Sequence, residues 1–422
     1  MIALLVAAGA AQLVPAHVDV ALLLENRAAL QGVRAFLASA GRHAPALAPE
    51  PLGRALAAAV GVDLLDGRDL GAEERDPLDP TAARRRPWGL ADGPRAVMRL
   101  GRSVGLSAPL EDPADARAAL DAWVSQAGRV RIESARGAQI RIAGRGRRTR
   151  AGAVLRADRV VVASGELARL LVTTLLRQSK PLEVPVSGPA VLYLRGWSTL
   201  IGVAAVLAGN PQGLSADGVA LAKRPLLSGP PAAEGGCAAA LFCARAGLGA
   251  GGKELLAAGA REWIGLALRG GERDGLDKAA QQIIAALPGP VLFRLEALHL
   301  DSSDPLWIPS FTAAAPQRGQ EPRELRFEAV WPLCLRVDAR AASLSDVCDR
   351  VQTVEPGEGD AQATLDSAAL AASLRRATPL ELGAYAARLL FAPLLDASGP
   401  ITLRARPEGA GARIELRWPL PR

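Results

Sequence analysis

The stretch that decides the fold class is RVRIESARGAQIRIAGRGRRTRAGAVLRADRVVVASG, which spans residues 129–165. Its first half alternates arginine with valine or isoleucine, and its last part contains a run of three valines. Residues typical of turns divide it at 136–138, 144–146 and 157–158. Because a period of two is typical of strands, this stretch predicts an antiparallel meander with one face exposed to water.

Apolar segments of strand or helix length lie on both sides of the meander. Before it, residues 18–24 predict a strand that enters a helix capped by Asn26, residues 96–100 a strand, and residues 113–124 a helix with one apolar stripe. After it, the pattern predicts strands at 190–194, 238–244, 290–298 and 330–337, and a terminal hairpin at 401–406 and 413–418. Helices are predicted at 252–260 and 343–350, and connections at 208–236, 312–323 and 355–363.

Each half of the chain thus begins with an apolar strand and ends near arginine-bearing hairpins. We therefore predict an α+β fold of two related modules, in which an apolar strand leads into helices and antiparallel hairpins form a mainly antiparallel sheet. The expected parts are a signal-like segment at 1–16, an N-terminal module at 17–180 and a C-terminal module at 181–422. Two unrelated α+β domains are the alternative.

The composition excludes some classes of protein. The 422 residues are 50% hydrophobic, with a mean hydropathy of +0.15, so the chain can bury a sizeable core and is not disordered throughout. Its 50 basic and 43 acidic residues give a net charge of +7 and a pI near 9.8. Almost all of the basic residues are arginine, which is first a sign of a GC-rich genome.

Several chemistries lack the residues that they need. The histidines His17, His43 and His299 stand alone, so local spacing offers no metal site with several histidine ligands. The cysteines form no CxxC pair, and the chain has no GxSxG or GxGxxG motif. We predict no catalytic residue, no metal and no cofactor. The cysteines leave two alternatives, a disulfide from Cys237 or Cys243 to Cys334 or four reduced, buried thiols (Cys237, Cys243, Cys334 and Cys348).

The first residues, MIALLVAAGAAQLVPA at 1–16, are typical of the apolar and cleavage regions of a secretory signal, although the basic start is missing. A signal predicts export to the periplasm or cell envelope. The alternative is a buried first strand at 2–7 in a cytoplasmic protein. No window reaches the roughly 18 apolar residues that a membrane-spanning helix needs.

A resemblance rests on Val14-Pro15-Ala16-His17-Val18-Asp19, followed by Ala29-Leu30, Gly61-Val62-Asp63-Leu64-Leu65 and Gly89-Leu90 before Pro94. In this order of segments the chain resembles a family of exported bacterial proteins of unknown function that have duplicated α+β halves. His17 departs from the usual spacing between proline and aspartate. The resemblance covers about the first hundred residues and implies a location in the cell envelope and no known catalysis.

One local pattern points to nucleotides. The segment Gly247-Leu-Gly-Ala-Gly-Gly252-Lys253 satisfies GxxxxGK between a predicted strand and a predicted helix, which makes Gly247, Gly252 and Lys253 candidate phosphate-binding residues. The next residue is Glu254, where a phosphate loop has the Ser or Thr that binds magnesium. In a chain with 43 glycines, composition alone also produces such a turn.

A second pattern is electrostatic. Residues 129–159 contain ten arginines against Glu133 and Asp158, so this segment alone has a charge of +8. On the predicted meander, Arg129, Arg131 and Arg141 share the solvent face. Guanidinium groups suit phosphates and carboxylates, so the segment is a candidate anion-binding surface. The candidate residues are Arg141, Arg145, Arg147, Arg148 and Arg150. Ordinary solvated strands are the alternative.

From these patterns we predict a non-enzymatic, exported or envelope-associated protein with a binding or structural role. Its expected partner is an anionic lipid or lipopolysaccharide surface, contacted through the arginine-rich meander. Nucleic acid is a weaker candidate because the basic segment contains no aromatic residue to stack on bases. The alternatives are a nucleotide-binding protein or enzyme that uses the Gly247–Lys253 loop, and a cytoplasmic scaffold.

Overall fold

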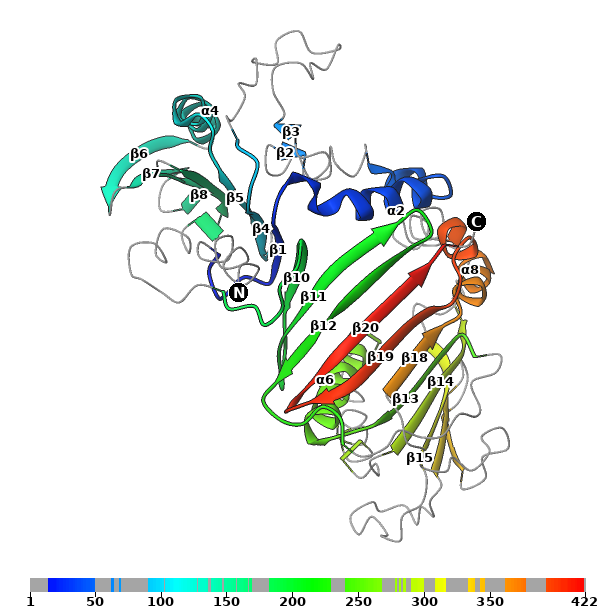
Figure 1. Ribbon diagram of the computed structural model, residues 1–422. Helices are drawn as coiled ribbons and strands as arrows, with labels where there is room; N and C mark the ends of the chain where they lie inside the picture. Colours follow the sequence, from blue (N-terminus) through cyan, green and yellow to red (C-terminus); the bar gives the residue numbers. More distant parts are fainter. Residues whose placement is uncertain are drawn as a thin grey trace. The chain divides into compact units, whose positions relative to one another are not determined.

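The computed structural model divides into two compact units, which are described one at a time (Figure 1). Unit 1 comprises Met1–Ala38, Ala46–Arg195 and Ala204–Pro211, and unit 2 comprises Ser39–Pro45, Gly196–Val203 and Gln212–Arg422. The structure describes residues 14–49, 62–63, 68–69, 90–101, 103–126, 128–135, 138–145, 148–156, 158–165, 167–168, 182–228, 240–267, 278, 281, 284–285, 290–299, 308–315, 333–337, 342–345, 361–376 and 392–420.

The sheet of unit 1 is antiparallel throughout, with the strand order β10-β1-β4-β5-β9-β8-β7-β6. Its strands are β1 (Val20–Leu24), β4 (Arg95–Leu100), β5 (Ser103–Pro109), β6 (Arg129–Ala135), β7 (Ala138–Arg145), β8 (Arg148–Leu155), β9 (Arg159–Ser164) and β10 (Ala190–Arg195). A separate pair joins β2 (Val62–Asp63) to β3 (Arg68–Asp69). The predicted meander is therefore present as β6 to β9.

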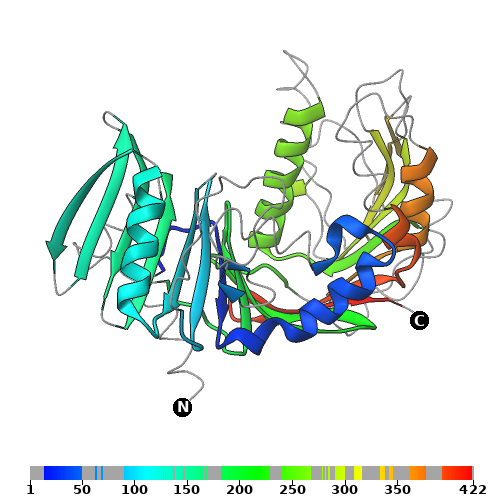
Figure 2. The same cartoon turned by 90° about the horizontal axis from the view of Figure 1, so that it is seen from above.

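Side chains cover both faces of this sheet. Helix α4 (Pro113–Gln126) lies against one side of this sheet (Figure 2). It buries Ala116, Leu120 and Val124 in a core that also contains Ala153 and Val162. On the opposite face, a second core includes Ile140, Val154 and Val161, together with Val14, Val18 and Met98. The predicted exposed face is thus wrong for β7, β8 and β9, because α4 covers the side that the arginine pattern indicated.

The N-terminal strand leads into a helix, as predicted, but in a different way. Asn26 precedes a single 3-10 turn, Arg27–Leu30, and the α-helix α2 (Gln31–Gly41) begins after it. The Asn26 side chain makes no capping hydrogen bond, and its Oδ1 atom is buried without a partner among the described residues. The prediction that Asn26 caps the helix is therefore wrong.

The sheet of unit 2 is also antiparallel, with the strand order β12-β20-β19-β18-β13-β14-β15-β16-β17. Its strands are β12 (Gly213–Ala222), β13 (Phe242–Gly247), β14 (Pro290–His299), β15 (Ile308–Ala315), β16 (Leu333–Val337), β17 (Ala342–Ser345), β18 (Ala361–Leu365), β19 (Ile401–Glu408) and β20 (Gly411–Pro419). Strand β11 (Leu200–Asn210) begins in unit 2 and continues in unit 1.

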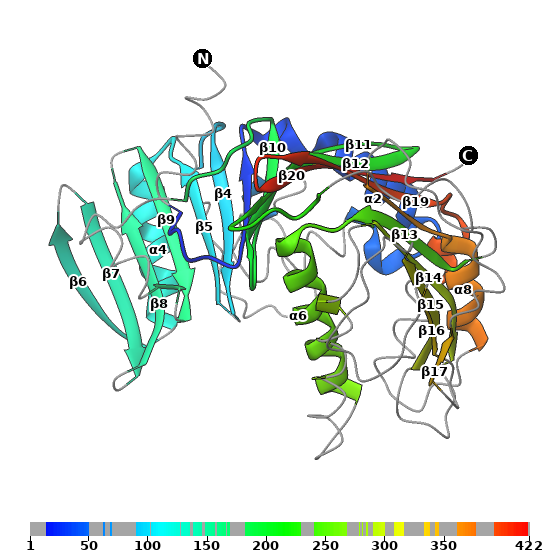
Figure 3. The ribbon, with the colours of Figure 1, turned by 90° about the horizontal axis from the view of Figure 1, so that it is seen from below.

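Two helices pack on this second sheet. Helix α6 (Ala250–Ala267) follows β13 (Figure 3). Its Leu255 packs against a core formed by Leu200, Ala220, Leu226 and Ala412. Helix α8 (Ser367–Arg376) buries Ala371 in another cluster, which also contains Ala392 and Leu395. The Ser367 hydroxyl donates to the carbonyl oxygens of Ser398 and Gly399, at 2.8 and 2.9 Å.

The structure confirms the coarse fold class, a mixed fold of mostly antiparallel strands with a few helices. It corrects several boundaries. Strand β12 and the end of β11 occupy the predicted connection 208–236, and β15 occupies part of 312–323. Residues 343–345 belong to β17 rather than to a helix. The spacing of apolar residues also predicts helices at 51–60, 166–177 and 378–391, but these ranges lie mostly or wholly outside the described residues.

Among the described helices, none is both long enough and apolar enough to span a membrane. The division of the chain at 180/181 stays a prediction.

Candidate functional site

The predicted anion-binding arginines do not form one exposed group. Arg141, on β7, is only 3% exposed, and its Nε donates to Asp121 Oδ1 of α4 at 2.5 Å. Its Nη1 also donates to Gln139 Oε1 at 3.4 Å. Its predicted place on the solvent face is therefore wrong, because its guanidinium group is buried and paired with the half-exposed carboxylate of Asp121.

The remaining arginines of the meander differ in environment. Arg129 and Arg131 are exposed on β6, which among the described strands pairs only with β7. Arg159 donates to Ser107 Oγ at 3.2 Å; burial lowers the pKa of its guanidinium, and Asp158 acts in the opposite direction. The side chains of Arg145, Arg148 and Arg150, and all of Arg147, lie outside the described residues.

The Gly247–Lys253 segment has the predicted order of strand, turn and helix, because β13 ends at Gly247 and α6 begins at Ala250. Its amides are nevertheless occupied. The Gly249 N–H donates to the Leu226 carbonyl oxygen at 3.0 Å, and the Gly251 N–H donates to the Pro225 carbonyl oxygen at 2.8 Å. A phosphate loop needs such amides free to bind phosphate.

The glycines of this segment instead permit close packing. A Cβ atom at Gly249, Gly251 or Gly252 would lie less than 3.0 Å from backbone carbonyl oxygens of residues 224–226. Glu254 pairs with Arg224, and the Lys253 Nζ donates to the Ala285 carbonyl oxygen at 3.4 Å. This geometry argues against a phosphate cradle and accounts for the glycines by backbone contact.

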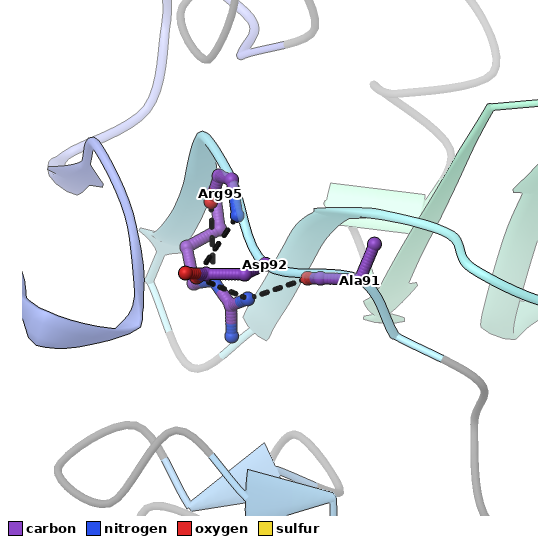
Figure 4. A network of polar contacts seen from close by, with 4 residues as sticks. Ala91, Asp92 and Arg95 are labelled. Atoms are coloured by element: carbon purple, nitrogen blue, oxygen red, sulfur yellow. Dashed lines mark hydrogen bonds and ion pairs between the residues drawn. The ribbon is translucent and has the colours of Figure 1, made fainter.

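Arg95 is the largest fully buried side chain among the described residues, at 2% exposure. Its Nη2 donates to the Ala91 carbonyl oxygen at 2.8 Å, and its Nε donates to the Gly93 carbonyl oxygen at 3.4 Å (Figure 4). Asp92 Oδ1 lies 3.9 Å from the same Nη2. Arg95 therefore fixes the loop that enters β4, and its guanidinium group is not available to a ligand.

Asp19, the aspartate of the resemblance, also has a structural contact. Its Oδ2 accepts a hydrogen bond from the Gly101 N–H at 2.7 Å, in the turn between β4 and β5. Its Oδ1 lies 3.9 Å from Arg195 Nη1, which donates to the His17 carbonyl oxygen at 3.2 Å. Asp19 thus ties β1, β10 and the β4–β5 turn together.

The terminal hairpin β19–β20 presents a better-placed group of arginines. In an antiparallel pair, residues directly opposite each other share a face. The register places Arg406 opposite Arg413, Arg404 opposite Glu415 and Thr402 opposite Arg417. All four arginines are exposed. We call Arg404, Arg406, Arg413 and Arg417 the arginine face.

Two carboxylates lie beside Arg417, at one end of the arginine face. Arg417 donates to Glu415 Oε1 at 2.7 Å and to Asp217 Oδ1 of β12 at 3.5 Å. Arg413 has no ion-pair partner among the described residues, and its cross-strand neighbour is Arg406. Glu408 lies on the same face, at the turn. Like charges directly opposite each other repel, and an anion between them would relieve the repulsion.

Cys243 on β13 is in a disulfide bond, so the alternative of four reduced thiols is wrong. Cys334 is on β16, and the order β13-β14-β15-β16 separates the two by three strand spacings. This distance of about 14 Å is beyond the reach of a disulfide, so Cys243 does not pair with Cys334, and Cys237 lies outside the described residues. Among the described residues, no three His, Cys, Asp or Glu side chains are grouped to hold a metal ion.

No protein-family model matches this chain, and no curated protein matches it. Among solved structures, the structure of crystal form IV of TP0453 is similar over 50% of this chain and 79% of that chain. The TM-score is 0.26 and the sequence identity is 8%. A similarity at this level carries no argument about function, and membership of the resembled family stays a prediction.

Proposed function

We propose that this protein is a non-enzymatic binding protein of the bacterial cell envelope that contacts an anionic surface through arginine side chains. The observation that carries the proposal is the exposed pair Arg406 and Arg413, which lie directly opposite each other on the terminal hairpin. Two guanidinium groups in this arrangement offer paired donors to a phosphate group.

The edge strand β6 supports the same proposal from unit 1. Arg129 and Arg131 are exposed there, at the start of the segment with ten arginines and two acidic residues. Of the meander arginines whose side chains are described, these are the two that face solvent. Unit 1 therefore contributes a second basic surface.

The disulfide at Cys243 supports the proposed export. Disulfides persist in oxidising compartments such as the periplasm and are rare in the cytosol. The signal-like segment at 1–16 agrees with that location. The intact mass of the protein purified from the envelope fraction, measured before and after reduction and alkylation, tests two things together. It shows the oxidation state of the cysteines and whether the chain is cleaved near Ala11. Fully reduced thiols and an intact Met1 on cytoplasmic protein would exclude export.

We further infer that the two units derive from related modules. Each contains a strand, a helix and then a four-strand meander, as β5-α4-β6 to β9 in unit 1 and β13-α6-β14 to β17 in unit 2. The pairing differs, because β5 pairs with the last meander strand, β9, whereas β13 pairs with the first, β14. A duplication would therefore have to include a change in strand order.

Vesicle co-sedimentation of the full chain tests the binding proposal. We expect the protein to bind vesicles that contain phosphatidylglycerol at low salt and to be released by salt on the order of 0.5 M. The double variant R406Q/R413Q should bind roughly 10- to 30-fold more weakly, at about 1 kcal/mol for each arginine near the surface. The matched control is R417Q, whose arginine is already paired with Glu415 and Asp217.

Two further results decide between the two basic surfaces. If R406Q/R413Q binds as tightly as the wild type, the arginine face is not the binding surface. A variant with Arg129, Arg131, Arg145, Arg147, Arg148 and Arg150 changed to serine tests the meander in the same assay. If neither variant loses affinity, or if the wild type does not bind anionic vesicles, the proposed function is wrong.

A further inference from the structure

A tight turn at Gly196–Ile201, which we call the Trp197 turn, opens strand β11. The Leu200 N–H donates to the Trp197 carbonyl oxygen at 3.1 Å, and the Gly196 N–H donates to the Ile201 carbonyl oxygen at 2.9 Å. Ser198 has φ +57°, and it is the only described residue other than glycine with a positive φ. A positive φ at the first central position alone is typical of a type II′ turn, which favours glycine there.

The Trp197 turn is closely packed, although it exposes large apolar side chains. A Cβ atom at Gly196 would lie less than 3.0 Å from the backbone of Leu200, so the two arms of the turn approach closely. Trp197 is 58% exposed and Ile201 is 48% exposed. Leu200, next to Ile201, is buried in the core of unit 2. The tip of the turn therefore offers two apolar side chains, on its two sides, to a surface that surrounds it.

Basic residues border this turn. The Lys223 N–H donates to the Thr199 carbonyl oxygen at 2.9 Å, and the Lys223 side chain is exposed. Three residues further on, the Leu226 N–H donates to the Ala410 carbonyl oxygen at 3.0 Å. Ala410 is in the turn of the terminal hairpin, directly before β20. The short segment 223–226 therefore connects the Trp197 turn to the end of the arginine face that contains Arg413.

We propose that the Trp197 turn inserts into the interfacial region of an anionic lipid bilayer. This inference rests on the proposed function and names its partner. Tryptophan is enriched at the interface between lipid and water, because its indole is apolar with one polar N–H. The positive charge of Lys223 and Arg413 is complementary to the negative surface of such a bilayer. A bilayer thus provides both the apolar contact and the anions.

The test uses the full chain and vesicles of phosphatidylcholine with phosphatidylglycerol. The variant W197A/I201S should bind these vesicles with at most about one tenth of the wild-type affinity, because it loses most of the apolar contact. The control L256A removes another exposed apolar side chain of unit 2, on α6, and should bind as the wild type does. Circular dichroism of each variant shows whether the fold is retained.

A second measurement, the quenching of tryptophan fluorescence by lipid, uses a variant of Trp197 alone and leaves Ile201 in place. Lipids brominated near the headgroup should quench part of the wild-type tryptophan fluorescence, and W197F, which keeps an aromatic ring, should lose that quenched part. If W197A/I201S binds as tightly as the wild type and W197F is quenched equally, the insertion is wrong while the proposed function stands. If the wild type does not bind anionic vesicles at all, both are wrong. If the substitutions instead dissociate an oligomer, a second copy of the chain covers the turn and the inference is wrong.

Discussion

The packing of Gly252 against the segment 224–226 predicts that the glycines of the 247–252 turn act in stability rather than in ligand binding. In the variant G252A, the new Cβ would lie less than 3.0 Å from the Leu226 carbonyl oxygen and 3.3 Å from Leu248 Cδ2. The first of these atoms is backbone, so it cannot move aside as the end of a flexible side chain can. Overpacking of this kind typically destabilises a protein by about 1–3 kcal/mol. The higher helix propensity of alanine offsets at most about 1 kcal/mol of that loss.

Helix α6 contains its own control. Gly259 is in the same helix, is exposed, and has no atom within 4 Å of a Cβ built on it. The variant G259A should therefore gain the helix-propensity difference alone and be more stable by about 0.5–1 kcal/mol. We expect the same chemical change to have opposite signs at two positions seven residues apart.

Urea unfolding of the full chain measures the stability of both variants. The midpoints are compared where the slope of unfolding free energy against urea concentration is unchanged. The reasoning about close packing is refuted if G252A is as stable as G259A. Addition of ATP with magnesium to the wild type separates the alternatives further. A ligand at 100 times its Kd would raise the unfolding free energy by about 2.7 kcal/mol, so a clear rise with ATP would restore the nucleotide interpretation.

Two more predictions concern unit 1. Replacing Asp121 by alanine removes the carboxylate that pairs with the buried Arg141 and leaves its hydrogen bond to Gln139. D121A should therefore lose about 1–3 kcal/mol in urea unfolding, less than the loss from a fully buried pair because Asp121 is half exposed. The double variant D121A/R141M should recover most of that loss, and no recovery would show that the pair is not the cause. Burial raises the pKa of Tyr193 above its usual value of 10.0, with Arg195 acting in the opposite direction, so the folded chain keeps the phenol neutral after the unfolded chain begins to ionise. The contribution of Tyr193 to the free energy of unfolding is therefore fully present below pH 10 and decreases as the pH rises through its folded pKa. Over that range the unfolding free energy of Y193F should fall less than that of the wild type. Equal falls in the two proteins would contradict a raised pKa of Tyr193.

Much of the strand content could be predicted because the spacing of apolar residues depends on local sequence alone. The meander, β10, β14 and the terminal hairpin were all expected near their observed positions. Strand β12 was missed because its sequence, GLSADGVALA, is rich in glycine, alanine and serine, which are typical of connections. Its pairing with β20 stabilises it from about two hundred residues away, and no local pattern contains that information.

The exposed face of the meander was mispredicted for a related reason. Ala143, Ala153 and Val162 face α4, but alanine marks a buried position only weakly, and Arg141 interrupts the same face with a charge. The ion pair between Asp121 and Arg141 depends on how α4 packs on the sheet. The local sequence pattern does not predict that packing. The same limit applies to the Gly249 and Gly251 amides, because their acceptors belong to a segment more than twenty residues earlier.

The register of the terminal hairpin, by contrast, was available from the sequence. The predicted turn at 408–411 already places Arg406 opposite Arg413, so the repulsive pair could have been found by counting outward from the turn. The charge of a continuous segment therefore indicates candidate anion-binding arginines less well than the charges of residues that lie opposite each other on paired strands. The segment with the largest formal charge contains Arg141, which is paired with Asp121, whereas the hairpin with fewer arginines has two exposed arginines directly opposite each other.

Arg413 and Arg417 show most directly why position decides what an arginine can bind. They are four residues apart on one strand and share one face, yet Arg417 lies beside Glu415 and Asp217 while Arg413 lies opposite another arginine. An anion that approached Arg417 would have to compete with two carboxylates, and an anion that approached Arg413 would relieve a repulsion. Any ligand with phosphate or carboxylate groups should therefore bind first at the turn end of the hairpin, which segment 223–226 connects to Trp197.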